Sequence, residues 1–275
     1  MKFKIAGFQM NVSQNKQKNI EKIESCIKGL KTKEIDMVVL PEMFICPYQT
    51  TLFKDYSEVE GGETWRKLSK IAKKYHIYLI AGSVPENENG KIYNTSYVFN
   101  REGEMIAKHR KIHLFDIDIK GGQYFKESDS LSSGESVTVF ETEFGKIGLC
   151  ICYDLRFPEL SRLMVDRGAK MIIVPAAFNM TTGPSHWDIL FRTRALDNQV
   201  FTLGVAPARD NFAGYISWAN SILVSPWGDI VNKLDENEDT LISEIDFDYV
   251  TKIREELPLL AHRRSDIYKI TSKEK

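Results

Sequence analysis

The sequence has no long hydrophobic run and no excess of charge of either sign. Its 275 residues contain no apolar stretch near the roughly 20 residues that a membrane-spanning helix needs. With 37 basic and 38 acidic side chains the formal net charge is −1, so no long-range field attracts nucleic acid or an anionic membrane. We therefore expect neither nucleic acid nor membrane as a partner.

Cysteine is scarce, and an apolar signal core is lacking at the start of the chain. Met1 and the next three residues lead directly into a strand-like pattern, which argues against secretion. Four cysteines, too few and too irregular for a disulfide framework, occur at positions 26, 46, 150 and 152. Cys150 and Cys152 would share a strand face, but no second Cys/His pair has zinc-like spacing. We expect a reducing, cytoplasmic location and no metal site.

The composition is that of an ordinary globular protein, with 43% hydrophobic and 27% charged residues. The length allows one large domain or two small ones. We see no linker-like stretch rich in Pro, Gly or Ser and no internal repeat. The sequence therefore predicts a single domain over residues 1–275, with a peripheral tail after about residue 266.

Hydrophobic periodicity predicts strands that alternate with helices early and follow one another late, which is typical of an α/β fold with a mixed sheet. Ser185 is the expected N-cap of the helix before Asn198. Residues 86–90 are expected to form a turn. Helices are expected over 15–31, 63–75, from 158, over 185–198 and over 247–256. Strands are expected over 2–10, 36–41, 76–83, 93–99, 104–111, 137–141, 146–151, 171–175, 201–206, 221–224, 230–234 and 240–246.

Two long stretches, residues 44–62 and 116–134, fit neither pattern and are expected to be loops. An irregular stretch of the length of residues 116–134 is usually functional in a compact domain.

An apolar strand within Lys146–Pro158 breaks abruptly at Asp154–Arg156, and Pro158 suits a first helical turn. In α/β proteins, a strand that ends sharply before a helix presents reactive side chains. Cys152 lies at this break, where a helix N-terminus would favour its thiolate. The alternative is a buried core cysteine.

Two further strand ends carry charge. Glu42 follows the apolar run Val38–Pro41, and Lys111 lies in the basic, strand-like segment Ala107–Phe115. Taken singly, Glu42 could be a helix cap and Lys111 part of a solvated sheet edge. Together with Cys152 they make a base, an electrophilic clamp and a nucleophile.

These residues lie in three segments, Pro41–Phe44, Arg110–Phe115 and Cys152–Leu160, that resemble the marker segments of the carbon–nitrogen hydrolase (nitrilase) superfamily. The resemblance covers nearly the whole chain. It implies a four-layer α-β-β-α sandwich and a homodimer or higher homo-oligomer. It also implies hydrolysis of a small-molecule amide through a thioester, without a cofactor.

In the chemistry implied, Cys152 attacks the amide carbonyl while Glu42 accepts the thiol proton. Lys111 and the backbone N–H of Tyr153 would stabilise the oxyanion. By resemblance, Glu127 orients Lys111 and the substrate; on chemistry alone it could be a solvated loop acid. Tyr153, where nitrilases carry Trp, points to amidases.

Four more segments resemble the ω-amidase group: Leu114–Ile119, Ala177–Trp187, Arg194–Gln199 and Ser225–Asp229. That group hydrolyses the terminal amides of α-ketoglutaramate and α-ketosuccinamate. Residues expected to line the pocket, though each could equally be packing, are Tyr48, Phe178, Thr181 and Thr182.

Arg156 could bind a substrate carboxylate with its guanidinium fork. Its alternative role is an ion pair with Asp154 or Glu159. His109 departs from relatives, which often carry Tyr there, and this weakens the substrate assignment.

Three other functions stay open. One is an N-carbamoyl amide or aliphatic amide hydrolase of the same superfamily. Another is a binding protein without catalysis, which would be expected to lack Glu42, Lys111 or Cys152. The last is a papain-like Cys–His arrangement, which would need His113 or His186 near Cys152.

Overall fold

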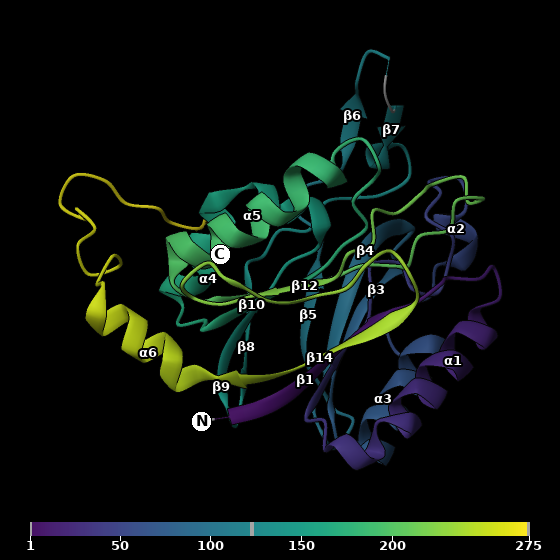
Figure 1. The fold of residues 1–275 in the computed structure, drawn as a ribbon. Helices are drawn as coiled ribbons and strands as arrows, with labels where there is room; N and C mark the ends of the chain where they lie inside the picture. Colours follow the sequence, from purple (N-terminus) through teal and green to yellow (C-terminus); the bar gives the residue numbers. More distant parts are fainter. Residues whose placement is uncertain (1, 122–123, 274–275) are drawn as a thin grey trace.

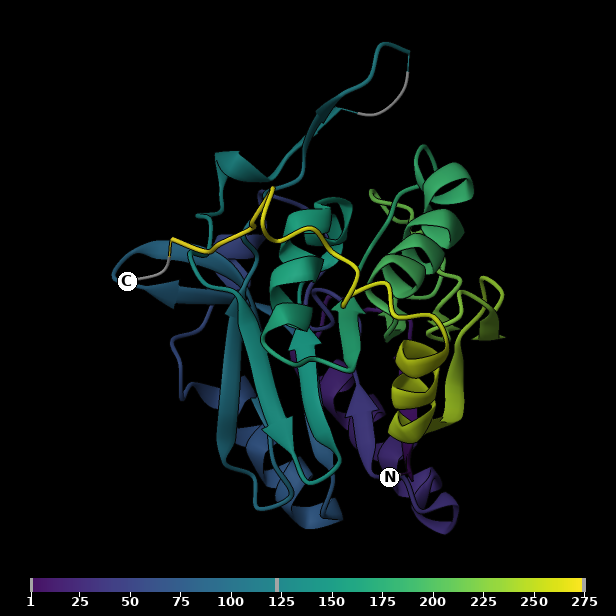
Figure 2. The same ribbon diagram turned by 90° about the vertical axis from the view of Figure 1, so that its left-hand side faces the viewer.

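The computed structural model describes residues 2–121 and 124–273. Two six-stranded sheets pack face to face, and helices cover the outer face of each (Figures 1 and 2). Helices α1 (Lys16–Gly29) and α3 (Glu63–Tyr75) cover one sheet, and α4 (Pro158–Asp166) and α5 (Gly183–Asn198) cover the other. The expected four-layer α-β-β-α sandwich is confirmed.

The first sheet has the order β14-β1-β2-β3-β4-β5, in which β1, β2 and β3 are parallel. Its last strand in the chain, β14, returns to pair with the first, from Lys2 opposite Asp246 to Gln9 opposite Asp239. The strands are β1 (Lys2–Gln9), β2 (Met37–Val39), β3 (Tyr78–Glu88), β4 (Lys91–Phe99), β5 (Met105–Arg110) and β14 (Asp239–Asp246).

The second sheet has the order β13-β12-β11-β10-β9-β8, with β9, β10 and β11 parallel. Because the central strands of both sheets are buried, their sequences are continuously apolar rather than alternating. The strands are β8 (Thr138–Thr142), β9 (Gly145–Leu149), β10 (Met171–Pro175), β11 (Phe201–Val205), β12 (Ile222–Val224) and β13 (Ile230–Lys233).

Helices α1 and α4 form where the sequence supplies both an end signal, an N-cap or a proline in the first turn, and an apolar face that is buried against a sheet. In α1, the side chain of Asn15 accepts a hydrogen bond from the N–H of Lys18, and Ile20, Ile23 and Ile27 are buried on one face. Pro158 occupies the first turn of α4, as expected. Two further helices are α2 (Phe53–Tyr56) and α6 (Phe247–Glu256).

Two local predictions were wrong. The turn expected over 86–90 is reduced to Asn89 and Gly90, because buried Glu86 pairs with Thr95 and Arg110 and keeps β3 extended to Glu88. Ser185 is not the N-cap of α5. That helix begins two residues earlier.

Both expected loops contain secondary structure. Residues 44–62 include α2, and residues 116–134 include β6 (Asp116–Asp118) and β7 (Tyr124–Lys126), which pair as a two-stranded ribbon. This ribbon projects from one end of the molecule (Figure 1). Within the described ranges, no helix is long and apolar enough to cross a membrane.

Candidate active site

The three residues expected at strand ends come from both sheets. Glu42 follows β2 and Lys111 follows β5 in the first sheet, whereas Cys152 follows β9 in the second. Glu127 comes from a short 3₁₀ turn after β7. The side chains of Glu42, Lys111 and Glu127 are fully buried, and Cys152 is 4% exposed. The site therefore lies inside the protein, where the two sheets meet.

A bulge in β3 holds Glu42 in place. The pairing of β3 with β4 shifts between Ala81 and Val84, so Gly82 and Ser83 leave the ladder. Gly82 has φ of +25°, and an added Cβ would lie 2.0 Å from the carbonyl oxygen of Pro41. The Ser83 hydroxyl accepts a hydrogen bond from the N–H of Met43 at 3.0 Å. The turn that carries Glu42 therefore requires glycine beside it.

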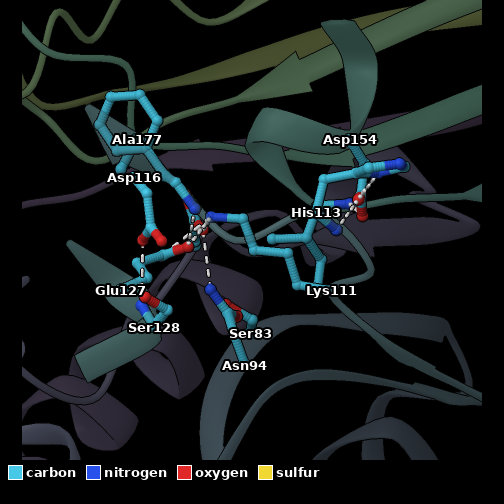
Figure 3. A network of polar contacts seen from close by, with 12 residues as sticks. Ser83, Asn94, Lys111, His113, Asp116, Glu127, Ser128, Asp154 and Ala177 are labelled. Carbon is cyan, nitrogen blue, oxygen red and sulfur yellow. Dashed lines mark hydrogen bonds and ion pairs between the residues drawn. The ribbon is translucent and has the colours of Figure 1, made fainter. Parts of the chain in front are cut away.

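The ammonium of Lys111 contacts two carboxylates, those of Glu42 and Glu127; Figure 3 shows Lys111 reaching towards Glu127. Its Nζ is 3.0 Å from Oε1 of Glu42 and 2.8 Å from Oε2 of Glu127. Burial alone would lower the pKa of Lys111, but the two carboxylates outweigh it and the pKa is raised. Burial, reinforced by Glu42, raises the pKa of Glu127 against the attraction of Lys111. One ammonium is shared by two acids.

Hydrogen bonds are distributed unevenly over Glu42. Its Oε1 lies 2.8 Å from Nδ2 of Asn94 and 3.1 Å from the hydroxyl of Tyr48, in addition to Lys111. The Tyr48 hydroxyl is closer, at 2.6 Å, to Oε1 of Glu127. In contrast, Oε2 of Glu42 is buried and finds no hydrogen-bond partner among the described residues. One oxygen of this carboxylate is therefore free to accept a proton.

Cys152 lies on a strained turn, with a left-handed φ of +46°. Burial and the Glu42 carboxylate hold the pKa of its thiol well above the ordinary value, and Lys111 and the N–H of Ala177 offset only part of this. The expectation that a helix N-terminus favours the thiolate was wrong. Helix α4 begins only at Pro158, after a 3₁₀ turn over Cys152–Arg156, and a helix dipole acts within about one turn.

A second buried cluster surrounds Asp154. Its carboxylate accepts hydrogen bonds from the N–H groups of Ile151 (3.1 Å) and His113 (2.9 Å). It also lies 3.0 Å from Nε2 of His109 and 2.8 Å from Nδ1 of His113. Burial alone would raise the pKa of Asp154, but the hydrogen bonds of both histidines hold it well below its usual range. This carboxylate ties the Cys152 turn to the segment that carries Lys111.

Arg156 forms neither of the ion pairs considered for it, because Asp154 is occupied by the histidines and Glu159 is exposed on α4. Its Nη1 lies 3.0 Å from Nδ1 of His186. Its guanidinium carbon lies 4.7 Å from the ring centre of Phe178. Its Nε is buried and has no hydrogen-bond partner in the part of the chain that the structure describes.

The remaining pocket candidates differ in their surroundings. Tyr48 lines a cavity with Glu42, Ala177 and Tyr215, and Phe178 packs edge-on against buried Trp187. The hydroxyl of Thr182 lies 2.9 Å from Oδ1 of Asn179, so this threonine fixes the start of α5. Thr181 is exposed. Neither threonine lines that cavity.

Sequence reasoning missed Asn94 and Tyr215. Asn94 is a fully buried amide in the polar run Asn94–Ser96 of β4, and nothing in the sequence set it apart from Thr95 and Ser96, which are buried as well. Tyr215 donates from its hydroxyl to the carbonyl of Ala177, and its ring centre is 4.6 Å from that of Tyr48. No sequence pattern pointed to it.

The papain-like alternative gains no support, because the contacts found for His113 and His186 are with Asp154, Phe157 and Arg156.

Comparison with known proteins gives concordant results. A family model described as carbon-nitrogen hydrolase matches residues 4–255. Omega-amidase NIT2-A of Xenopus laevis is 47% identical over 272 residues, covering 99% of both chains. Human omega-amidase NIT2 is 44% identical over 271 residues, 98% of both. The crystal structure of Nit3 from Saccharomyces cerevisiae, 40% identical, superposes with a TM-score of 0.88 over 96% of this chain and 97% of Nit3.

Proposed function

Because the chain belongs to the carbon–nitrogen hydrolase family, we propose that it releases ammonia from the terminal amide of small 2-oxo dicarboxylate monoamides such as α-ketoglutaramate and α-ketosuccinamate. Family membership makes it a hydrolase of carbon–nitrogen bonds other than peptide bonds, acting on a small-molecule amide. The ω-amide specificity and the steps below are our proposal.

The first half-reaction forms a thioester. Cys152 begins as a neutral thiol, and Glu42 removes its proton through Oε2 as sulfur attacks the amide carbon. The Lys111 ammonium and the N–H of Tyr153 stabilise the negative oxygen of the tetrahedral intermediate. When the carbon–nitrogen bond breaks, Glu42 returns the proton to the departing ammonia.

The second half-reaction uses water. Glu42 takes a proton from water as its oxygen attacks the thioester carbon, and the proton then passes to the Cys152 sulfur as the carboxylic acid leaves. Glu127 and Tyr48 do not transfer protons in this scheme. They hold the Lys111 ammonium beside Glu42, at the distances already given.

The observation that carries the substrate assignment is that the guanidinium of Arg156 has no carboxylate partner among the residues that the structure describes. Burial lowers its pKa, and the groups that oppose this shift are Cys152, Tyr153 and Tyr215, with no carboxylate among them. A partly buried arginine without a counter-ion, within electrostatic range of the nucleophile, suits a substrate carboxylate. Phe178 and Tyr48 are the proposed apolar contacts. Thr181 and Thr182 are not among the proposed substrate contacts, since neither lines the cavity beside Glu42.

We further propose that the chain forms one domain and assembles into a homodimer in the cytoplasm. Edge strand β13, the turn before it and the adjoining face of α5 carry large exposed apolar side chains, namely Ile189, Leu196, Trp227, Ile230 and Val231. Such a patch favours a protein partner. All four cysteines are unpaired thiols, in keeping with a reducing compartment.

The decisive experiment measures ammonia release from α-ketoglutaramate, glutamine, an N-carbamoyl amino acid and a simple nitrile, with Cys152→Ala as the blank. We expect strong turnover of α-ketoglutaramate that depends on Cys152. Turnover of the carbamoyl compound instead would retain the chemistry of Glu42, Lys111 and Cys152 but rule out the ω-amidase assignment.

A further inference from the structure

We propose that His186 is a positioning residue that turns the guanidinium of Arg156 towards the substrate carboxylate. This inference rests on the proposed function, since it concerns how the same site selects acidic amides. The observation behind it is the 3.0 Å contact between Nη1 of Arg156 and Nδ1 of His186.

The two kinds of contact made by Arg156 constrain different motions. Stacking over Phe178 at 4.7 Å and near Tyr153 at 5.6 Å restrains the plane of the guanidinium. Stacking does not fix rotation within that plane. The hydrogen bond to His186 does, because it holds one of the three nitrogens at a defined point.

That rotation decides which edge of the fork faces a ligand. With Nη1 occupied by His186, the edge left for a carboxylate is formed by Nε and Nη2. Nε is buried and has no hydrogen-bond partner within residues 2–121 and 124–273, so one N–H donor on that side is left without an acceptor there. A bidentate carboxylate would accept from both nitrogens of this edge.

His186 itself is suited to this role. It lies in the first turn of α5, where its N–H donates to the carbonyl of Thr182 at 2.9 Å. To accept from arginine, its Nδ1 must be unprotonated, with the ring proton on Nε2. Partial loss of hydration, reinforced by the charge of Arg156, lowers the pKa of His186, which keeps the ring neutral. The residue is exposed, so core packing does not explain the contact.

The test compares His186→Ala, His186→Asn and His186→Gln on α-ketoglutaramate and on the neutral amide butyramide. Asn carries an acceptor at the position of Nδ1, whereas Gln carries it one bond further out. We expect His186→Ala and His186→Gln to lower the kcat/KM ratio of the acidic over the neutral amide roughly 3- to 10-fold, the factor of one ordinary hydrogen bond, mainly through KM. His186→Asn should restore the ratio.

An unchanged ratio in His186→Ala, or a His186→Asn variant no better than His186→Gln, would overturn the inference. Thermal unfolding of each variant checks that the fold is retained. Arg156→Ala separates the two proposals. If it raises KM for α-ketoglutaramate while His186→Ala does not, only the positioning role fails. If Arg156→Ala has no effect, the carboxylate site itself is wrong.

Discussion

Two buried clusters of charge flank the Cys152 turn, and they differ in how fully their carboxylates are hydrogen-bonded. Asp154 accepts from two backbone N–H groups and faces two imidazoles, so both of its oxygens are occupied. In Glu42, Oε1 makes all three contacts, with Lys111, Tyr48 and Asn94, and no described residue bonds to Oε2.

The difference separates a structural carboxylate from a reactive one. A buried acid that is fully hydrogen-bonded holds its neighbours rigidly and takes up a proton only at a pH well below its usual range. A buried acid with one free oxygen is destabilising in the resting protein, and such groups are concentrated where chemistry occurs. Burial alone would not distinguish Glu42 from Asp154, since both side chains are fully buried.

The largest combined loss of stability and activity is expected from removing the ammonium of Lys111, the cation of the Glu42 cluster. Lys111→Met leaves Glu42 and Glu127 buried without compensation, which should lower the free energy of unfolding by about 3–5 kcal/mol. It also removes an oxyanion donor, worth about 100- to 1,000-fold in rate. Urea unfolding and ammonia release measure the two losses.

A double variant provides the control for this prediction. Lys111→Met combined with Glu127→Gln removes one negative charge and should recover part of the stability but none of the activity. A Lys111→Met protein as stable as the parent would show that the ammonium does not compensate the two acids.

Glu42→Gln should abolish activity and spare the fold. Gln keeps an acceptor for Asn94 and Tyr48 but cannot take a proton, so kcat should fall about 100- to 10,000-fold. Unfolding should change little, because the variant also removes repulsion between Glu42 and Glu127. Activity within tenfold of the parent would exclude Glu42 as the base.

Asp154→Asn is the matched substitution in the Asp154 cluster. In contrast to Glu42→Gln, it should lower stability more than activity. Whichever way the amide is oriented, its NH₂ faces donors, so we expect a loss of about 1–3 kcal/mol of stability. The loss in kcat should be smaller than that of Glu42→Gln.

The pH dependence sharpens this prediction. Hydrogen bonds hold the pKa of folded Asp154 well below the unfolded value of about 3.9. Its contribution to stability is therefore complete above about pH 4 and is lost as the pH falls further. The stability difference between the parent and Asp154→Asn, measured by urea unfolding at pH 7 and pH 3.5, should shrink at the lower pH. A constant difference would contradict the assignment.

The sequence was sufficient to single out Glu42, Lys111 and Cys152 because each lies at the end of an expected strand and because their three segments together resemble one family, and the structure places all three after strands of the two packed sheets. The sequence was insufficient to predict the pKa shifts of the buried groups in the site. The thiol pKa of Cys152 depends on burial and on Glu42, which lies in the other sheet. The sequence alone does not give that proximity.

Turn propensity failed at residues 86–90 for a related reason. The segment Glu86–Gly90 has the composition of a turn. Its first residue, Glu86, is nevertheless only 1% exposed, because Arg110 and Thr95 on neighbouring strands form hydrogen bonds with its carboxylate. Tyr215 was missed because its position beside Tyr48 depends on how a loop folds back over the sheet end. In both places, contacts distant in sequence outweigh local preference.

The left-handed backbone at Cys152 bears on how this protein tolerates change. A residue other than glycine costs about 1 kcal/mol or more in that conformation. Glycine would relieve this cost, and the protein would lose its nucleophile. Selection for robustness and selection for turnover therefore oppose each other at this single position. A screen that scores only thermal resistance would favour an inert chain, so any directed evolution of this scaffold must assay turnover in every round.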